Sequence, residues 1–240
     1  MSIQTSPPAG WYPAPDGSSA SWWWDGARWT TPSGEFGGHP AATTRLVKLA
    51  VATEALLIVY GAISVLTIGV QAFGISSISV YMNGYDSVFG LLETVDWMTV
   101  VASIISGIAF LATAVLWLLW QYRAAKQFSV EMQSSAGWHV GSWFVPIISW
   151  WVPYQNVSDL WRSVGRSRPA WQIVWWLSWL GGNVALQIAA SLYTRAQDLE
   201  QLRIAMTVNI AGQSLLMTAA LLAWLIVHGI TQGAIRRSFG

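Results

Sequence analysis

Four long apolar runs limit what this chain can fold into. A helix needs about 20 mostly apolar residues to cross a bilayer core about 30 Å thick. The runs that qualify lie at 49–73, 97–121, 171–193 and 205–231. A fifth run, at 138–153, contains Pro146, ends at Pro153 and is short for a span. We therefore predict an all-α membrane protein with four transmembrane helices and one proline-broken segment that is re-entrant or interfacial.

The composition agrees with a membrane protein and excludes several other classes. Charged residues make up 10% of the chain and hydrophobic residues 54%, whereas soluble domains carry about 25% charged residues. An ordinary soluble enzyme and a disordered chain are therefore both excluded. The net charge of +1 argues against nucleic acid as a partner. Because the chain has no cysteine, disulfides and cysteine-ligated metals are excluded as well.

Basic residues, which favour the cytoplasmic side of a membrane, indicate how the chain crosses it. The loop at 73–96 contains no Lys or Arg but has three acidic residues. If the segment at 138–153 does not cross, ten basic residues lie on one side and only Arg195 and Arg203 on the other. If it crosses, seven basic residues lie on one side and five on the other. We therefore predict a multi-pass protein of the cell membrane with both termini in the cytoplasm.

The first 44 residues have a different character, because they hold six of the nine prolines and no long apolar run. Asp-Gly pairs at 16–17 and 25–26 are strong signals for tight turns between strands. We predict a miniature Trp-rich β-hairpin or meander within 1–31, a flexible linker at 32–44, and the membrane domain at 45–240. The module is too small for an ordinary hydrophobic core, so stacked aromatic rings have to supply its apolar contacts.

This module contains Gly-Trp-Tyr-Pro-Ala-Pro at 10–15 and Ser-Trp-Trp-Trp-Asp-Gly-Ala-Arg-Trp-Thr at 21–30. It resembles the short actinobacterial module catalogued as domain of unknown function 2510, with Ala14 and Trp22 where that family usually has Asp and Arg. Two interpretations remain open. The rings either bind a proline-rich or extended peptide of a partner, or they only hold the small fold together. The residues concerned are Trp11, Tyr12, Trp22, Trp23, Trp24 and Trp29.

The stretch around the proline-broken segment has a distinctive motif. It reads Trp-Phe-Val-Pro-Ile at 143–147, Pro-Tyr-Gln at 153–155 and Leu-Trp-Arg at 160–162. Over roughly 45–235 the chain resembles the membrane family catalogued as domain of unknown function 4328, with Ser149 where we expect Asn. The resemblance implies a shared membrane fold but no established activity, and pairing with the first module is a known arrangement in such proteins.

Polar residues of the membrane domain form the second candidate site. Backbone freed by a proline cannot face lipid unsatisfied, so the segment at 138–153 is either a substrate or ion site or, as we favour, an interfacial anchor. Asp159 and Arg162 are three residues apart and can pair. The site residues that we predict are Glu54, Arg123, Ser149, Tyr154, Gln155, Asn156, Asp159, Arg162, Asn183 and Gln187.

Two features inside the spans have alternative interpretations. Glu54 lies about five residues into the first span, where an ionisable residue is expected to have a function or a partner. We expect it to pair with Arg123 or Arg162; proton or cation binding is the alternative. The amides Asn183 and Gln187 form one polar stripe, and a second stripe at 209 and 213 repeats the spacing. Such stripes either join helices by hydrogen bonds or, less often, line a pathway.

The sequence contains no nucleophile–base arrangement, nucleotide-binding motif or metal-ligand spacing. We therefore expect no enzymatic activity, no cofactor and no metal. The predicted function is a membrane-anchored scaffold or adaptor whose aromatic module recruits a cytoplasmic protein partner. The alternative is a small transporter or channel subunit that uses Glu54 and the segment at 146–156. Membrane lipid surrounds the spans, and a GxxxG motif at Gly229 and Gly233 favours close helix packing or a homo-oligomer.

Overall fold

The computed structural model describes residues 7–15, 21–26, 29–30, 40–84, 89–129 and 132–239. The expected Asp-Gly turn at 16–17, Arg28 and most of the expected linker at 32–44 lie outside these described residues. Four helices are long and apolar enough to cross a membrane, which confirms the number of predicted spans. They are α2 (Pro40–Met82), α3 (Phe89–Gln127), α6 (Gln172–Arg195) and α7 (Leu199–Phe239).

Three of these helices are much longer than the apolar runs that predicted them. Helix α2 has 43 residues, α3 has 39 and α7 has 41. The length of α2 is set by the residues at its two ends. A helix ends where a proline or a glycine changes the backbone, and a change in hydropathy alone does not end it. Pro40 starts α2 at a position where the missing N–H is not needed. Gly84, with φ of +89°, lies just beyond its last turn.

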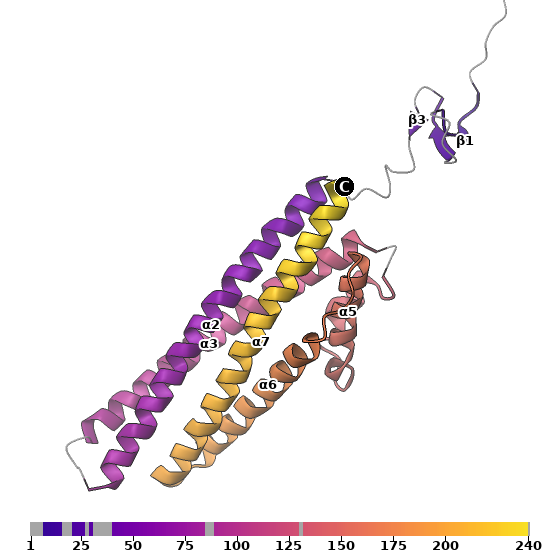
Figure 1. The fold of residues 1–240 in the computed structure, drawn as a ribbon. Helices are drawn as coiled ribbons and strands as arrows, with labels where there is room; N and C mark the ends of the chain where they lie inside the picture. Colours follow the sequence, from indigo (N-terminus) through magenta and orange to yellow (C-terminus); the bar gives the residue numbers. More distant parts are fainter. Residues whose placement is uncertain are drawn as a thin grey trace, which may run out of the picture.

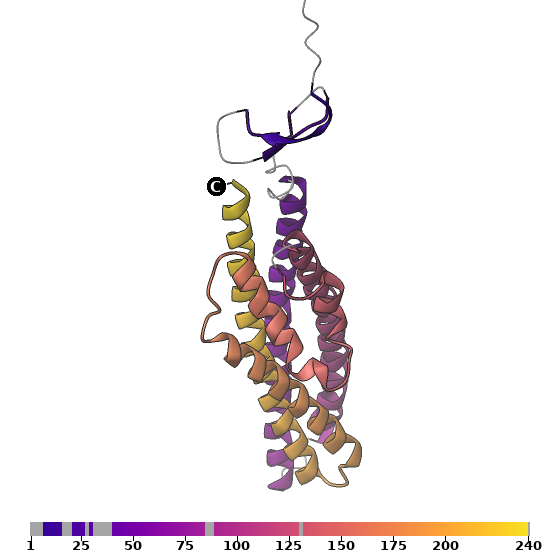
Figure 2. The ribbon, with the colours of Figure 1, turned by 90° about the vertical axis from the view of Figure 1, so that its right-hand side faces the viewer.

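The four long helices lie side by side in the order α3, α2, α7, α6. Helix α2 packs along both α3 and α7, and α7 packs along α6 (Figures 1 and 2). The short connection at 196–198 joins α6 to α7 at one end of the bundle, whereas Pro40 and Phe239 lie together at the other end (Figure 1). The end with Pro40 and Phe239 is called the open end below.

The proline-broken segment lies beside the bundle as two short helices joined by turns. They are α4 (Ala136–Gly141) and α5 (Val152–Ser163), with the 3₁₀ turn η2 (Ile148–Trp150) between them. Helix α3 ends toward the open end and α5 runs back toward it, whereas α6 begins near the middle of the bundle (Figure 1). The chain from 136 to 163 therefore returns toward the side from which it came, in agreement with a segment that does not cross. The side chain of Ser135 caps α4, and Pro153 lies in the first turn of α5.

Helix α5 is held against α7 by the two glycines of the GxxxG motif. A methyl group at Gly229 would overlap the ring of Trp161, and one at Gly233 would lie 2.8 Å from Val164 Cβ. Arg166 Nη1 donates to Gly229 O at 3.2 Å. The motif therefore provides close packing within one chain, which is the first of its two interpretations.

The amino-terminal module is a three-stranded antiparallel sheet in the order β1, β2, β3, which confirms the expected small β unit. Its strands are β1 (Gly10–Pro13), β2 (Ser21–Trp24) and β3 (Trp29–Thr30). Tyr12 pairs with Trp22, and Trp24 pairs with Trp29. Because side chains alternate along a strand, these four aromatic residues share one face of the sheet, and Trp11 and Trp23 lie on the other.

Candidate functional site

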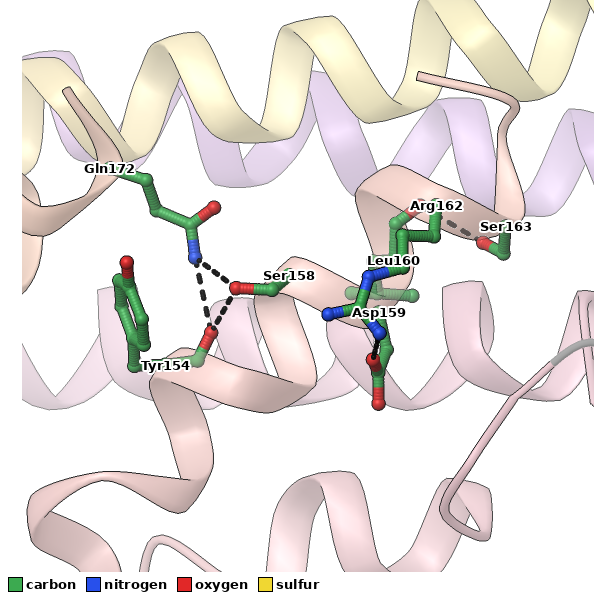
Figure 3. Close-up of polar contacts among 7 residues, drawn as sticks. All are labelled: Tyr154, Ser158, Asp159, Leu160, Arg162, Ser163 and Gln172. Atoms are coloured by element: carbon green, nitrogen blue, oxygen red, sulfur yellow. Dashed lines mark hydrogen bonds and ion pairs between the residues drawn. The ribbon is translucent and has the colours of Figure 1, made fainter. Parts of the chain in front are cut away.

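The polar groups of the proline-broken segment bond partly to the bundle and partly to one another. Gln172 Nε2 donates to Ser158 Oγ at 3.0 Å and to Tyr154 O at 3.1 Å (Figure 3). Asn156 Nδ2 donates to Ser142 Oγ at 3.0 Å. These bonds satisfy backbone and side-chain groups that lipid could not satisfy, so they support the anchor interpretation over a ligand site.

Tryptophan N–H groups complete this attachment. Trp143 Nε1 donates to Gln121 Oε1 at 3.0 Å, and Trp176 Nε1 donates to Trp150 O at 2.9 Å. On the outer side, Phe144 and Ile147 are 72% and 71% exposed. The segment therefore has one face bonded to the helices and one strongly apolar exposed tip, as expected of a structure at a membrane interface.

Two arginines, one in the last turn of α5 and one shortly after it, bind groups of α5 itself. Arg162 Nη1 lies 3.1 Å from Asp159 Oδ1 (Figure 3). Burial raises the pKa of Asp159, and the charge of Arg162 opposes that rise. Arg168 Nη1 donates to Tyr154 Oη at 2.8 Å, and its guanidinium lies 5.4 Å from the centre of the Tyr154 ring. Of the other predicted residues here, Gln155 is exposed and Ser149 is half-buried.

The expected partner of Glu54 was wrong. Glu54 Oε1 lies 3.4 Å from His228 Nδ1 of α7, whereas Arg162 pairs with Asp159 and Arg123 is exposed on α3. The physical reason is the register of the helices. Helix α2 lies along both α3 and α7, and at Glu54 the side chain that faces the carboxylate is His228 of α7. The sequence placed His228 at a span end but gave no sign that it faces Glu54.

Two predicted amide stripes come together around a hollow in the bundle. Asn183 of α6 lines it with Asn209 and Gln213 of α7, and the volume is about 260 Å³. Asn183 Nδ2 donates to Trp179 O at 2.7 Å. The oxygens Asn209 Oδ1 and Gln213 Oε1 are buried, and neither has a hydrogen-bond partner among the described residues. The stripes therefore share a cavity, while Gln187, the other member of the first stripe, is exposed.

Sequence reasoning missed the hydroxyl groups of this polar hollow. Tyr60 of α2 and Ser103 and Ser106 of α3 also line it. Isolated Ser and Tyr residues are common in apolar helices, where their hydroxyls often bond to the preceding turn, so they gave no distinct signal. The full lining is Tyr60, Ser103, Ser106, Gly107, Phe110, Asn183, Leu186, Asn209, Gln213 and Leu216.

The cavity lined by Asn183, Asn209 and Gln213 is called the polar hollow. A second cavity, called the aromatic hollow, adjoins it on the side of the proline-broken segment. Its volume is about 250 Å³, and Tyr60, Phe110 and Leu216 line both cavities. Four tryptophans form much of its wall, with ring centres 5.5 Å apart for Trp117–Trp175 and 5.1 Å apart for Trp143–Trp179. The two hollows together involve all four long helices.

In the amino-terminal module the six predicted aromatic residues divide into two groups. Trp24 and Trp29 have ring centres 5.0 Å apart, and Tyr12 and Trp29 have theirs 6.1 Å apart. Trp24 Nε1 donates to Pro7 O at 3.0 Å, and Tyr12 Oη donates to Pro8 O at 2.8 Å. This face, on which Trp22 is half-buried, therefore packs its rings together and holds the module's own proline segment.

On the opposite face of the sheet lie the other two of the six aromatic residues, Trp11 and Trp23. Trp11 and Trp23 meet edge to face with ring centres 5.5 Å apart. Trp11 is 59% exposed and Trp23 is 38% exposed. This pair, called the Trp11–Trp23 pair below, contains the most exposed ring of the predicted site, and Trp29 on the other face is 38% exposed as well.

Histidine does not form a metal site in the described part of the chain, where no group of three or more potential metal ligands was found. His139 of α4 is fully buried, and neither ring nitrogen has a hydrogen-bond partner among the described residues. Burial lowers the pKa of His139 to about 4. The ring is therefore neutral near pH 7 and acts as a packed side chain.

Comparison with known proteins gives one match. No curated protein and no solved structure matches the chain. The family model described as "Domain of unknown function (DUF4328)" matches residues 86–232. That region includes α3, the proline-broken segment, α6 and nearly all of the long last helix, so the match covers most of the membrane domain. The chain belongs to this family of unknown function.

Proposed function

We propose that this protein is a membrane-anchored adaptor whose amino-terminal module recruits a protein partner in the cytoplasm. The observation that carries the proposal is the exposed Trp11–Trp23 pair. Tryptophan is enriched among the residues that dominate binding energy at interfaces, and two adjacent exposed rings on a flat sheet offer a large apolar contact surface. The rings that hold the module together lie on the other face, so the pair is not needed for that purpose.

The chemistry of the module favours an extended, proline-containing segment as the ligand. On the opposite face, Trp24 and Tyr12 already hold Pro7 and Pro8 by donating hydrogen bonds to their carbonyl groups. Aromatic surfaces recognise such segments because a proline-rich chain is already extended and its carbonyl groups are free to accept bonds. The Trp11–Trp23 pair offers the same kind of surface to a second segment.

The distribution of charge supports a cytoplasmic location for the open end of the bundle. Among the described residues, only Arg195 and Arg203 are basic near the α6–α7 connection. The others lie toward the open end, and they are Arg45, Lys48, Arg123, Lys126, Arg162, Arg166, Arg168, Arg236 and Arg237. Basic residues concentrate on the cytoplasmic side of membrane proteins. The module precedes α2 at this end, which supports recruitment from the cytoplasm.

The alternative, transport through Glu54 and the segment at 146–156, has less support. Glu54 is engaged by His228, and Gln155 is exposed. Neither residue lines the polar hollow that contains Asn183. A transport pathway would need these polar groups to share one cavity.

A photo-reactive amino acid at position 11 of the full chain, expressed in cells, tests the proposal. The expected result is a covalent adduct to another protein that disappears when Trp23→Ala is added. The matched control places the same group at Leu66, which is 69% exposed on α2 and should give lipid adducts. Adducts from position 11 to lipid or to the chain itself, with none to another protein, would refute the adaptor.

A further inference from the structure

We infer that the polar and aromatic hollows together form a binding site for a neutral molecule dissolved in the membrane. The ligand would have a flat apolar body and at least one hydroxyl or N–H donor. This inference is independent of the adaptor function, because it rests on the membrane domain alone.

The polar hollow contains acceptors that lack donors. Gln213 is only 4% exposed, and its Oε1 has no hydrogen-bond partner in the described chain. Asn209 Oδ1, one helical turn away on α7, is also buried and has no hydrogen-bond partner in the described chain. Buried polar groups are almost always hydrogen-bonded, and here two oxygens that lack a partner lie on one cavity wall. A ligand that donates hydrogen bonds satisfies both.

The lining indicates that the ligand is neutral. Among the described residues, no Asp, Glu, Lys, Arg or His lines either hollow. A charged ligand would lose its hydration in such a site without gaining an opposite charge. Hydroxyl and amide groups, by contrast, match a neutral alcohol, phenol or amide.

The aromatic hollow provides the space for an apolar body next to these acceptors. Trp117, Trp143, Trp175 and Trp179 give it rings that can contact a flat ligand edge to face or in offset stacks. Each hollow measures about 250–260 Å³. Together they fall within the range of about 300–1,000 Å³ that is typical of small-molecule sites.

The helix order gives the ligand a route from the lipid. Helices α2 and α7 pack together in the middle of the row, so α3 and α6 are the outer walls on either side of the hollows. Ser103 and Gly107 of α3 line the polar hollow and are exposed. At the other end of the site, Phe144 lines the aromatic hollow and is exposed. A molecule dissolved in the membrane can therefore enter sideways between α3 and α6.

The test uses the full-length protein in lipid nanodiscs and two fluorinated probes observed by ¹⁹F NMR. The first, 6-fluoro-2-naphthol, has a flat body and a hydroxyl donor. The second, 6-fluoro-2-methoxynaphthalene, has nearly the same shape and no donor. Empty nanodiscs correct for partition of each probe into lipid. We expect saturable binding of the naphthol, and binding of the methoxy compound weaker by about fivefold or more, as for the loss of one hydrogen bond in a buried site.

Three variants locate the site. Gln213→Leu and Asn209→Leu each remove an acceptor. Because the naphthol has a single O–H donor, at least one of the two variants should weaken its binding by about fivefold or more. Gln187→Leu removes an exposed amide of α6 outside the hollow and should leave binding unchanged. Equal binding of the two probes by the unaltered protein overturns the inference. This comparison does not depend on whether any variant folds. Unchanged naphthol binding by both folded variants, Gln213→Leu and Asn209→Leu, overturns it as well. A dimer that dissociates on Gln213→Leu, because a second copy covers the amides, also overturns it.

Discussion

Glu54 of α2 and His228 of α7 face each other inside the membrane domain, with 3.4 Å between the carboxylate Oε1 and the imidazole Nδ1. The ring of His228 also stacks on Trp224, at 5.1 Å between centres and 8° between planes. The two helices that form the middle of the bundle are thus joined by a polar contact. An acidic side chain at this depth is stabilised by such a partner, since lipid offers none.

We expect the two residues to be coupled in stability. Glu54→Gln and His228→Gln should each lower the free energy of unfolding, and the double variant should lose less than the sum, by about 0.5–2 kcal/mol. Thermal or denaturant unfolding in nanodiscs measures the cycle. The control is the partly exposed pair Glu200–Arg203 on α7, with side chains 46% and 38% exposed, for which the coupling should stay below about 0.5 kcal/mol. Additive losses for Glu54 and His228 would show that the contact contributes nothing to stability.

Acid should destabilise the protein through His139. The pKa of this buried ring is about 4 in the fold, against about 6.5 in an unfolded chain. Between these values the unfolded chain binds a proton that the fold does not, so stability falls as the pH drops from about 6.5 to about 4. The full loss is on the order of 3 kcal/mol. His139→Leu should remove this part of the pH dependence, and equal pH profiles for the variant and the natural protein would contradict it.

Gly229 should be intolerant of a side chain because the Trp161 ring occupies the space. We expect Gly229→Ala to destabilise the fold by about 1–3 kcal/mol, the usual effect of overpacking. Gly69→Ala in α2, where nothing lies within 4 Å, should instead be neutral or stabilising, because Ala favours a helix. Analytical ultracentrifugation should show the same oligomeric state for both variants. A change of oligomeric state with Gly229→Ala would mean that the motif also serves contacts between chains.

The two faces of the amino-terminal sheet should respond differently to truncation. Trp24→Ala removes the contact with Trp29 and the hydrogen bond to Pro7, so limited proteolysis within 7–30 should become faster. Trp23→Ala removes only a ring of the exposed pair and should leave the proteolysis rate unchanged. Membrane-fraction yield should stay constant for both, since the spans satisfy their own backbone groups. Faster proteolysis of Trp23→Ala would mean that the pair is needed for folding and is no free surface.

The features of this structure that the sequence predicts are those that depend on a single segment of the chain and not on contacts between distant segments. Apolar length predicted the number of spans, and proline and Asp-Gly positions predicted the broken segment and the small sheet. Glu54 and His228 are 174 positions apart in the chain. Their contact depends on the register of two helices, and no local pattern encodes that register. Likewise, helical spacing placed Asn209 and Gln213 on one face of α7, but only the packing of four helices shows that this face borders a cavity.

The arrangement of the four spans, with the proline-broken segment returning to the side of the open end, is tested most directly by cysteine labelling on this naturally cysteine-free chain. Single variants Gln133→Cys, Ser167→Cys and Gln197→Cys place a thiol at exposed positions before α4, after α5 and between α6 and α7. An impermeant maleimide added outside intact cells should label position 197 and spare positions 133 and 167. Labelling of 167 but not of 133 would show that the proline-broken segment crosses the membrane.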